Sequence, residues 1–122
     1  MEKIMPKAAI IVLADTETHG DLGRVVNALE AVKELKEAGD EVKLIFDGAG
    51  TQWIPKLSEK THRAHRLFVS VEDRIAGACA YCAGAFKATE GVKAANVPLL
   101  DEYEGHPSVR QLLADGFSII TF

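Results

Sequence analysis

Cysteine is scarce in this chain of 122 residues, which contains only two, both in the tetrapeptide Cys79-Ala80-Tyr81-Cys82. A disulfide framework needs more cysteines, spread along the chain, so a disulfide-stabilised secreted domain is not expected. The sequence also lacks an apolar run approaching the ~20 residues that cross a bilayer. The start, Met1-Glu2-Lys3-Ile4-Met5-Pro6, is too short and too polar for a secretory signal. We therefore expect a cytoplasmic protein with no membrane partner.

A surplus of positive charge is missing as well, because 14 Lys and Arg against 18 Asp and Glu give a formal net charge of -4. This balance argues against nucleic acid as the main partner. The length allows one domain, residues 1–122, and is too short for two. A hydrophobic share of 48% is enough for a packed core. The composition therefore predicts a single globular domain.

Short apolar segments rich in branched residues recur along the chain. Residues 8–14 form a continuous apolar run, which is typical of a strand buried on both faces of a parallel sheet. Residues 41–46 and 75–79 predict two further strands, and residues 97–100 and 117–122 predict a weak fourth and a last one. Because helix-length segments separate these strands, we predict a three-layer α/β/α sandwich around a mostly parallel sheet of about five strands.

Helical spacing marks the segments between the first strands. From Leu22 to Leu35 the apolar residues recur with a helical period, Asp21 can serve as N-cap, and Gly39 suits the left-handed position after the helix. Pro55 fits the first turn of a short helix. Residues 64–75 alternate in part like a strand, but their length favours a helix.

The second half of the chain predicts shorter helices. A turn at residues 80–81 and a helix from about Cys82 should follow the third strand, and Gly91 should end or kink that helix. Ser108 and Gln111 match a capping box at the start of a last helix.

The Cys-x-x-Cys motif is the sharpest chemical signal in the sequence. In open parallel sheets, sites form at the carboxyl ends of the strands, where residues 15–20, 47–51 and 79–82 should meet. A strand end followed by a helix start presents free N–H groups that favour a thiolate. We therefore expect Cys79 to be the reactive thiol, with a depressed pKa, and Cys82 to be less accessible and to act second. The alternative is that both sulfurs are simply packed in the core.

Three further residues are candidates for binding at this edge. His19 and His106 each follow a predicted strand end and could lower a thiol pKa or position a sulfur acceptor, and Asp47 begins the turn after the second strand. Zinc is an alternative, because His62 and His65, three residues apart, could complete a Cys₂His₂ set. Their predicted place across a strand from Cys79 disfavours it, so we expect no metal and no other cofactor.

Two short motifs and the order of elements resemble the DsrE/DsrF-like family over nearly the whole chain. The motifs are Phe46-Asp47-Gly48-Ala49-Gly50 after the second strand and Ala78-Cys79-Ala80-Tyr81-Cys82-Ala83 after the third. The resemblance implies a homo-oligomer, a trimer or hexamer. In several members a cysteine at the position of Cys79 carries sulfur as a persulfide between relay proteins, and some have a second where Cys82 stands. Many members then have an Arg-Gly pair, whereas this chain has Phe86-Lys87.

Three functions remain open from the sequence. The first is a sulfur carrier that takes sulfane sulfur from a donor protein and passes it to an acceptor. The second is a thiol–disulfide oxidoreductase that uses the same cysteine pair, and the third is an oligomeric scaffold or regulatory protein with packed cysteines. Trp53, Phe68, Tyr81 and Phe86 are expected to contribute to an exposed apolar patch through which copies of the chain associate.

Overall fold

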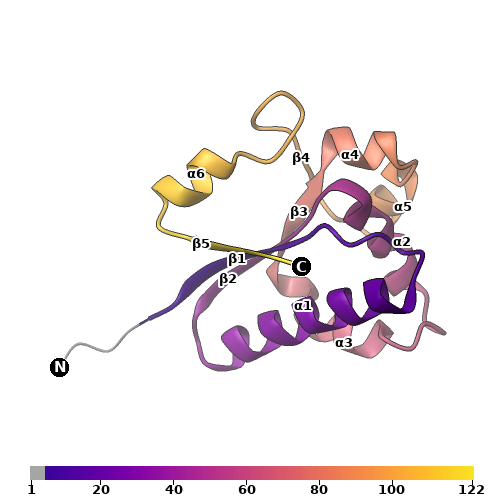
Figure 1. Cartoon of the computed structure of the whole chain (residues 1–122), viewed down its shortest axis with the longest axis horizontal. Coiled ribbons are helices and arrows are strands. Elements are labelled where there is room, and N and C mark those ends of the chain that lie inside the picture. Colours follow the sequence, from indigo (N-terminus) through magenta and orange to yellow (C-terminus); the bar gives the residue numbers. More distant parts are fainter. Residues whose placement is uncertain (1–4) are drawn as a thin grey trace.

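The computed structural model of the chain describes residues 5–122 and contains a five-stranded, all-parallel sheet (Figure 1). The strands, in the order β4-β3-β2-β1-β5 across the sheet, are β4 (Leu99–Leu100), β3 (Ile75–Cys79), β2 (Glu41–Phe46), β1 (Lys7–Val12) and β5 (Ser118–Thr121). The predicted parallel pairing of the first three strands is confirmed. Residues 1–4, most of the segment weighed as a leader, lie outside the described residues.

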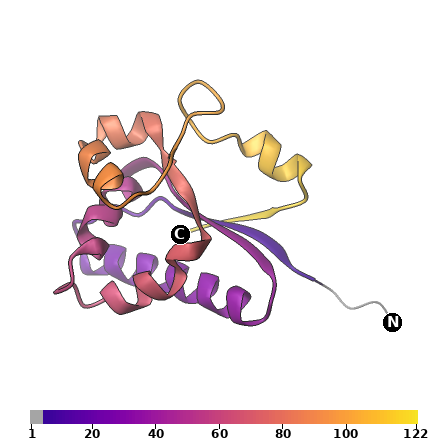
Figure 2. The ribbon, with the colours of Figure 1, turned by 180° about the vertical axis from the view of Figure 1, so that it is seen from behind.

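Helices cover both faces of this sheet, unequally. The strands β1 to β4 follow one another in a single direction, so their connecting helices lie on one face, and the chain then returns across the other face to β5 (Figures 1 and 2). The first face carries α1 (His19–Glu37), α2 (Trp53–Ser58), α3 (His65–Val71), α4 (Ala80–Ala85) and α5 (Thr89–Ala94), and the second carries α6 (Val109–Ala114). The predicted three-layer α/β/α sandwich is confirmed.

The core is divided by the central strand β1. Its residues 8–12 are all buried, as the apolar run predicted. Because side chains alternate along a strand, Ile10 joins the large cluster under α1 to α5, and Ile11 joins a small cluster with Leu112 and Phe117 under α6. The strand ends at Val12, earlier than predicted, and Leu13 is exposed.

Helix α1 begins earlier than predicted because Thr18, not Asp21, is its N-cap. The hydroxyl of Thr18 accepts a hydrogen bond from the N–H of Asp21 (3.1 Å), and the Asp21 carboxylate accepts one from the N–H of Thr18 (3.1 Å). This reciprocal capping box satisfies two free donors of the first turn. Hydrogen bonding to Thr18 lowers the pKa of Asp21. Gly39 has a φ of +82°, as predicted for the position after the helix.

The later helices also differ from their predicted limits. Helix α4 starts at Ala80 directly after β3, with no intervening turn, because Cys79 itself caps it. Helix α4 ends at Ala85, shortly before Lys87, whose φ is +56°. Gly91 lies inside the next helix, α5. A Cβ on Gly91 would lie 2.7 Å from Pro55, so this glycine permits close packing of α5 on α2 and does not end a helix.

The last helix is capped by half of the predicted box. The Ser108 hydroxyl accepts a hydrogen bond from the N–H of Gln111 (3.1 Å). The Gln111 side chain donates to Asp115 (2.9 Å) and so supports the end of the helix.

The predicted helix over residues 64–75 is confirmed as α3, which is followed by the 3₁₀ turn η2 (Glu72–Arg74). Within residues 5–122, no helix is long and apolar enough to cross a membrane.

Candidate thiol site

Four side chains converge at the carboxyl edge of the sheet. One donor atom from each of Asp47, Cys79, Cys82 and His106 lies within 4.8 Å of all the others. Asp47 follows β2, Cys79 ends β3, Cys82 lies in the first turn of α4, and His106 belongs to the segment between β4 and α6. Four of the five residues proposed from the sequence therefore share one site.

Cys79 lies at the bottom of this site, fully buried, with a free thiol. Its Sγ accepts a hydrogen bond from the N–H of Cys82 (3.3 Å) and lies 3.2 Å from Nδ1 of His106. Its thiol also reaches the carbonyl oxygen of Gly105 (3.8 Å). Burial raises the pKa of Cys79 to about 12; the Asp47 carboxylate adds to the rise, and the Cys82 N–H opposes it.

The predicted depressed pKa of Cys79 is therefore wrong, and so is the predicted order of accessibility. Cys82 is partly exposed, whereas Cys79 is not. The Cys79 sulfur is surrounded by groups from two segments: the Cys82 N–H at the start of α4, and the Gly105 carbonyl and His106 ring of the segment after β4. With only six residues, α4 supplies too weak a dipole to offset the desolvation.

His106 is held in the site by a two-residue turn that the sequence analysis did not identify. Tyr103 and His106 exchange two backbone hydrogen bonds, each of 2.8 Å. Glu104 (φ +49°) and Gly105 (φ +83°) between them both have positive φ, as a type I′ turn requires. The turn docks on α4, because the Gly105 carbonyl accepts the Tyr81 N–H (2.9 Å). The Tyr81 and His106 rings lie 4.9 Å apart, which fixes the imidazole further.

Asp47 is fixed by the tight turn at the end of β2. It caps the 3₁₀ helix η1 (Gly48–Gln52) by accepting the Gly48 N–H (2.7 Å), and its own N–H donates to the Val12 carbonyl (2.9 Å). Gly50 lies so close to β1 that an added Cβ would sit 2.1 Å from the Val12 oxygen. Gly48 (φ +54°) and Gly50 are therefore required by the backbone of this turn.

The remaining histidine candidates lie outside the cluster. His19 is exposed at the start of α1 and lines a separate cavity of about 280 Å³ with Trp53 and His62. His62 accepts the Ala64 N–H (3.0 Å), and His65 is bonded to the Leu57 carbonyl (2.8 Å). The zinc set considered from the sequence, with His62 and His65, is not formed.

The aromatic residues expected on an exposed patch are divided. Tyr81 (64% exposed) and Phe86 (41%) lie on the surface, as predicted. Trp53 and Phe68 are buried, each 3% exposed, so this part of the prediction is wrong. The Trp53 indole donates a hydrogen bond to the Ala14 carbonyl (3.0 Å), and Phe68 packs edge-on against Phe46.

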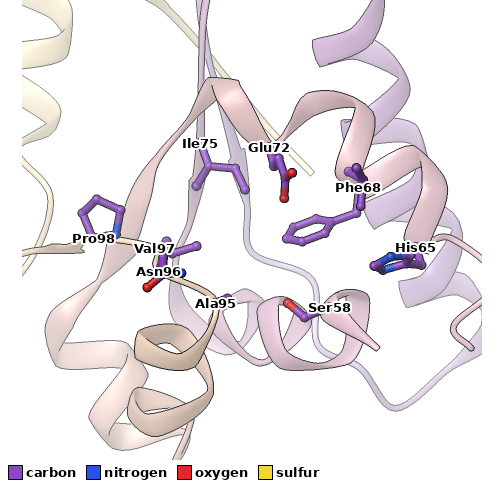
Figure 3. Close-up of a pocket in the computed structure, with 10 residues that line it drawn as sticks. Ser58, His65, Phe68, Glu72, Ile75, Ala95, Asn96, Val97 and Pro98 are labelled. Atoms are coloured by element: carbon purple, nitrogen blue, oxygen red, sulfur yellow. The ribbon is translucent and has the colours of Figure 1, made fainter. Parts of the chain in front are cut away.

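A cavity of about 630 Å³ adjoins the four-residue site. It is lined by Asp47 and His106 of the site itself, together with Tyr103 and residues 107–110. A second cavity, of about 430 Å³, lies between α3, the start of β3 and residues 95–98 (Figure 3). Glu72 and Phe68 line it from one side and Val97 and Pro98 from the other, and none of its lining residues is a cysteine. The first cavity therefore borders the site through Asp47 and His106, and the second does not touch it.

Fold and site together define an α/β protein with a Cys-x-x-Cys motif at the carboxyl end of the third strand of a parallel sheet. The chain belongs to the family of the uncharacterised protein MJ0733 of Methanocaldococcus jannaschii. The two are 33% identical over 96 residues, which is 79% of this chain and 78% of that protein.

Two further comparisons concern the fold and the family models. A solved structure, that of the conserved protein of unknown function BT1422 from Bacteroides thetaiotaomicron, has a TM-score of 0.62 and is 15% identical. The structural match covers 93% of this chain and 94% of the BT1422 chain, and it shows a shared fold only. A comparison with protein-family models found no match.

Proposed function

We propose that this protein carries sulfane sulfur as a cysteine persulfide and transfers it to a partner thiol. The observation that carries the proposal is the pair of free thiols at the sheet edge, one partly exposed and one buried, beside a cavity large enough for an approaching group. The resemblance of residues 46–50 and 78–83 to the DsrE/DsrF-like family supports the same chemistry. The donor and acceptor are then thiol-bearing proteins.

The accessibility of the two sulfurs assigns the carrying role to Cys82. Its thiolate attacks the outer sulfur of a donor persulfide, the donor's S–S bond breaks, and the donor leaves as a thiolate. An acceptor thiolate then attacks the outer sulfur of the Cys82 persulfide. The acceptor becomes the persulfide, Cys82 is released as a thiolate, and no oxidant or reductant is consumed. Cys79 is a positioning residue, because its sulfur holds the backbone N–H of Cys82.

Sulfur loading of variants tests this assignment. The metal-free protein is incubated with a persulfide donor, and its intact mass is measured before and after treatment with a reductant. We expect the wild type and Cys79→Ser to gain one sulfur atom that reduction removes, and Cys82→Ser to gain none. Absence of any gain in the folded wild type, or a gain in Cys82→Ser equal to that of the wild type, would contradict the proposal.

Thiol–disulfide exchange is the second candidate, favoured by the closeness of the two sulfurs. A protein of this kind would lose two hydrogen atoms to an oxidising disulfide, which is reduced, as its own cysteine pair forms a disulfide. It would gain no sulfur from a persulfide donor. The same mass measurement therefore separates the two functions. If neither change occurs, the cysteines belong to a scaffold.

We also propose that the protein works in the cytoplasm, where its thiols stay reduced, and that it does so as a homo-oligomer. Support comes from exposed apolar side chains of α6, because Val109 is 52% exposed and Leu113 is 57% exposed. Strand β5 is moreover an unpaired edge of the sheet.

The mass in solution tests this association. Light scattering at micromolar concentration should give a multiple of 13.2 kDa, as a trimer or hexamer requires. The double variant Val109→Glu/Leu113→Glu should shift the protein towards the monomer, because it places charge on the apolar face. The matched pair Arg110→Glu/Asp115→Lys, on exposed polar positions of the same segment, should not. A wild type that is monomeric throughout would refute the association.

A further inference from the structure

We propose that Asp47, Cys79, Cys82 and His106 form a binding site for one transition-metal ion, and that zinc is the ion they fit best. The site goes beyond sulfur transfer and stands whether or not the chain carries sulfur. It departs from the expectation of a metal-free chain, which rested on His62 and His65 as the only histidines considered for zinc.

The spacing of the donor atoms is the first support. One carboxylate oxygen, two thiol sulfurs and one imidazole nitrogen lie within 4.8 Å of one another. In a tetrahedral zinc site with bonds of about 2.0–2.3 Å, neighbouring ligand atoms are about 3.3–3.8 Å apart. The Cys79 sulfur and the His106 Nδ1 already lie at 3.2 Å. Small rotations of the side chains thus suffice to close a shell around an ion.

The chemistry of the donors is the second support. Zinc is bound in proteins by cysteine sulfur, histidine nitrogen and carboxylate oxygen, and this set supplies all three. Two thiolates exclude the hard cations Mg²⁺ and Ca²⁺, which take oxygen ligands. With four protein ligands the shell is complete, as in zinc sites that hold an ion and leave no position for a catalytic water.

The backbone that presents the donors is the third support. The ligands come from three separate segments, and each segment is fixed independently of any metal. Asp47 is held by the Gly48 N–H and the Val12 carbonyl, Cys79 and Cys82 by the cap of α4, and His106 by its two-residue turn. The Asp47 carboxylate accepts the Gly48 N–H through one oxygen, which leaves the other for an ion.

Occupation by zinc would have a consequence for sulfur transfer. Both thiols serve as ligands, so Cys82 cannot attack a persulfide while the ion is bound. Zinc would then hold both sulfurs as ligands, and its removal would free the partly exposed Cys82 for attack. Only this consequence rests on the proposed sulfur chemistry.

Metal titration of the full chain tests the site directly. The protein is stripped with a chelator, checked for folding by circular dichroism, and titrated with Co²⁺ and then with Zn²⁺ under reducing conditions. We expect one Co²⁺ per chain, with the visible bands of tetrahedral coordination and a thiolate-to-cobalt charge-transfer band, and its displacement by one Zn²⁺.

Variants identify the ligands. His106→Gln and Asp47→Asn should weaken zinc binding by about tenfold or more. Cys82→Ser, at a partly exposed position, should reduce the thiolate-to-cobalt charge-transfer band to about half, because one of the two thiolates is lost. The control His65→Gln, remote from the cluster, should bind like the wild type. A folded wild type that takes up no stoichiometric ion overturns the proposal, as do His106→Gln and Asp47→Asn variants that bind like the wild type. Sulfur loading is measured on the metal-free chain, so the two proposals fail separately.

Discussion

In the metal-free Cys82→Ser variant, the remaining Cys79 should alkylate about a hundredfold more slowly than a free cysteine at neutral pH. In the wild type, burial is the main cause that raises the pKa of Cys79 to about 12, against about 8.5 for a free thiol. The variant keeps that burial, so its thiolate should be scarcer by up to about three orders of magnitude. The higher basicity of the rarer thiolate restores about half of that loss on a logarithmic scale. Exclusion of the reagent from a fully buried sulfur slows the reaction further.

The pH profile distinguishes this cause from simple shielding. A thiol with a raised pKa stays protonated in the folded protein, so the alkylation rate of Cys79 should rise about tenfold per pH unit from pH 7 to 10, without a plateau. Shielding alone would give a slow reaction that levels off near the pKa of a free thiol.

The matched variant is Cys79→Ser, which leaves the partly exposed Cys82 and should react much faster than Cys82→Ser at every pH below 10. The measurement is the rate of iodoacetamide incorporation, followed by intact mass. A Cys79 rate equal to that of free cysteine at pH 7.5 would mean that His106, 3.2 Å away, stabilises the thiolate more than burial destabilises it. The roles would then return to those expected from the sequence.

The two proposals for the four-residue site require different properties of a thiol. Sulfur transfer needs a thiol that another molecule can reach, which Cys82 supplies. Metal binding needs donors held at fixed separations, which the buried Cys79 and the clamped His106 supply. A buried sulfur is a poor nucleophile and a well-fixed ligand, so the burial of Cys79 is compatible with both proposals.

The strands and the edge that carries the site were predictable, because both follow from short-range patterns. Apolar runs of branched residues predicted β1 and β2. Because parallel strands place their carboxyl ends at one edge of the sheet, the sequence also predicted that Asp47, Cys79 and Cys82 lie close together. His106 was a candidate only because it follows a strand. Its contact with Cys79 depends on the turn that reverses the chain at Glu104 and Gly105.

Some properties could not be predicted because they depend on the exact residue at which a helix starts or ends, to within one or two positions. A helix start at Cys82 and one at Ala80 fit the same pattern of small residues, and the observed start at Ala80 makes Cys79 the cap of α4. The burial that raises the pKa of Cys79 also involves Gly105 and His106, which lie far along the chain. Gly91 likewise suggested the end of a helix, whereas its missing side chain makes room for Pro55.

Replacement of Gly50 by alanine should be among the most destabilising single changes in the chain. The new Cβ would lie 2.1 Å from the carbonyl oxygen and 2.7 Å from the carbonyl carbon of Val12. Neither atom can yield easily, because Val12 belongs to β1, which is paired on both sides, and its oxygen accepts the Asp47 N–H. We expect a loss of about 3 kcal/mol or more in the free energy of unfolding, at the upper end for overpacking.

Gly23→Ala is the matched control, because Gly23 lies at an exposed position inside α1 with no atom within 4 Å of an added Cβ. This change should stabilise the protein by up to about 1 kcal/mol, since alanine favours a helix interior over glycine. Urea unfolding of both variants measures the difference. A Gly50→Ala midpoint equal to that of the wild type would show that the β2–η1 turn can move away from β1. Because the same turn fixes Asp47, such a movement would also carry one of the four donor side chains out of the thiol site.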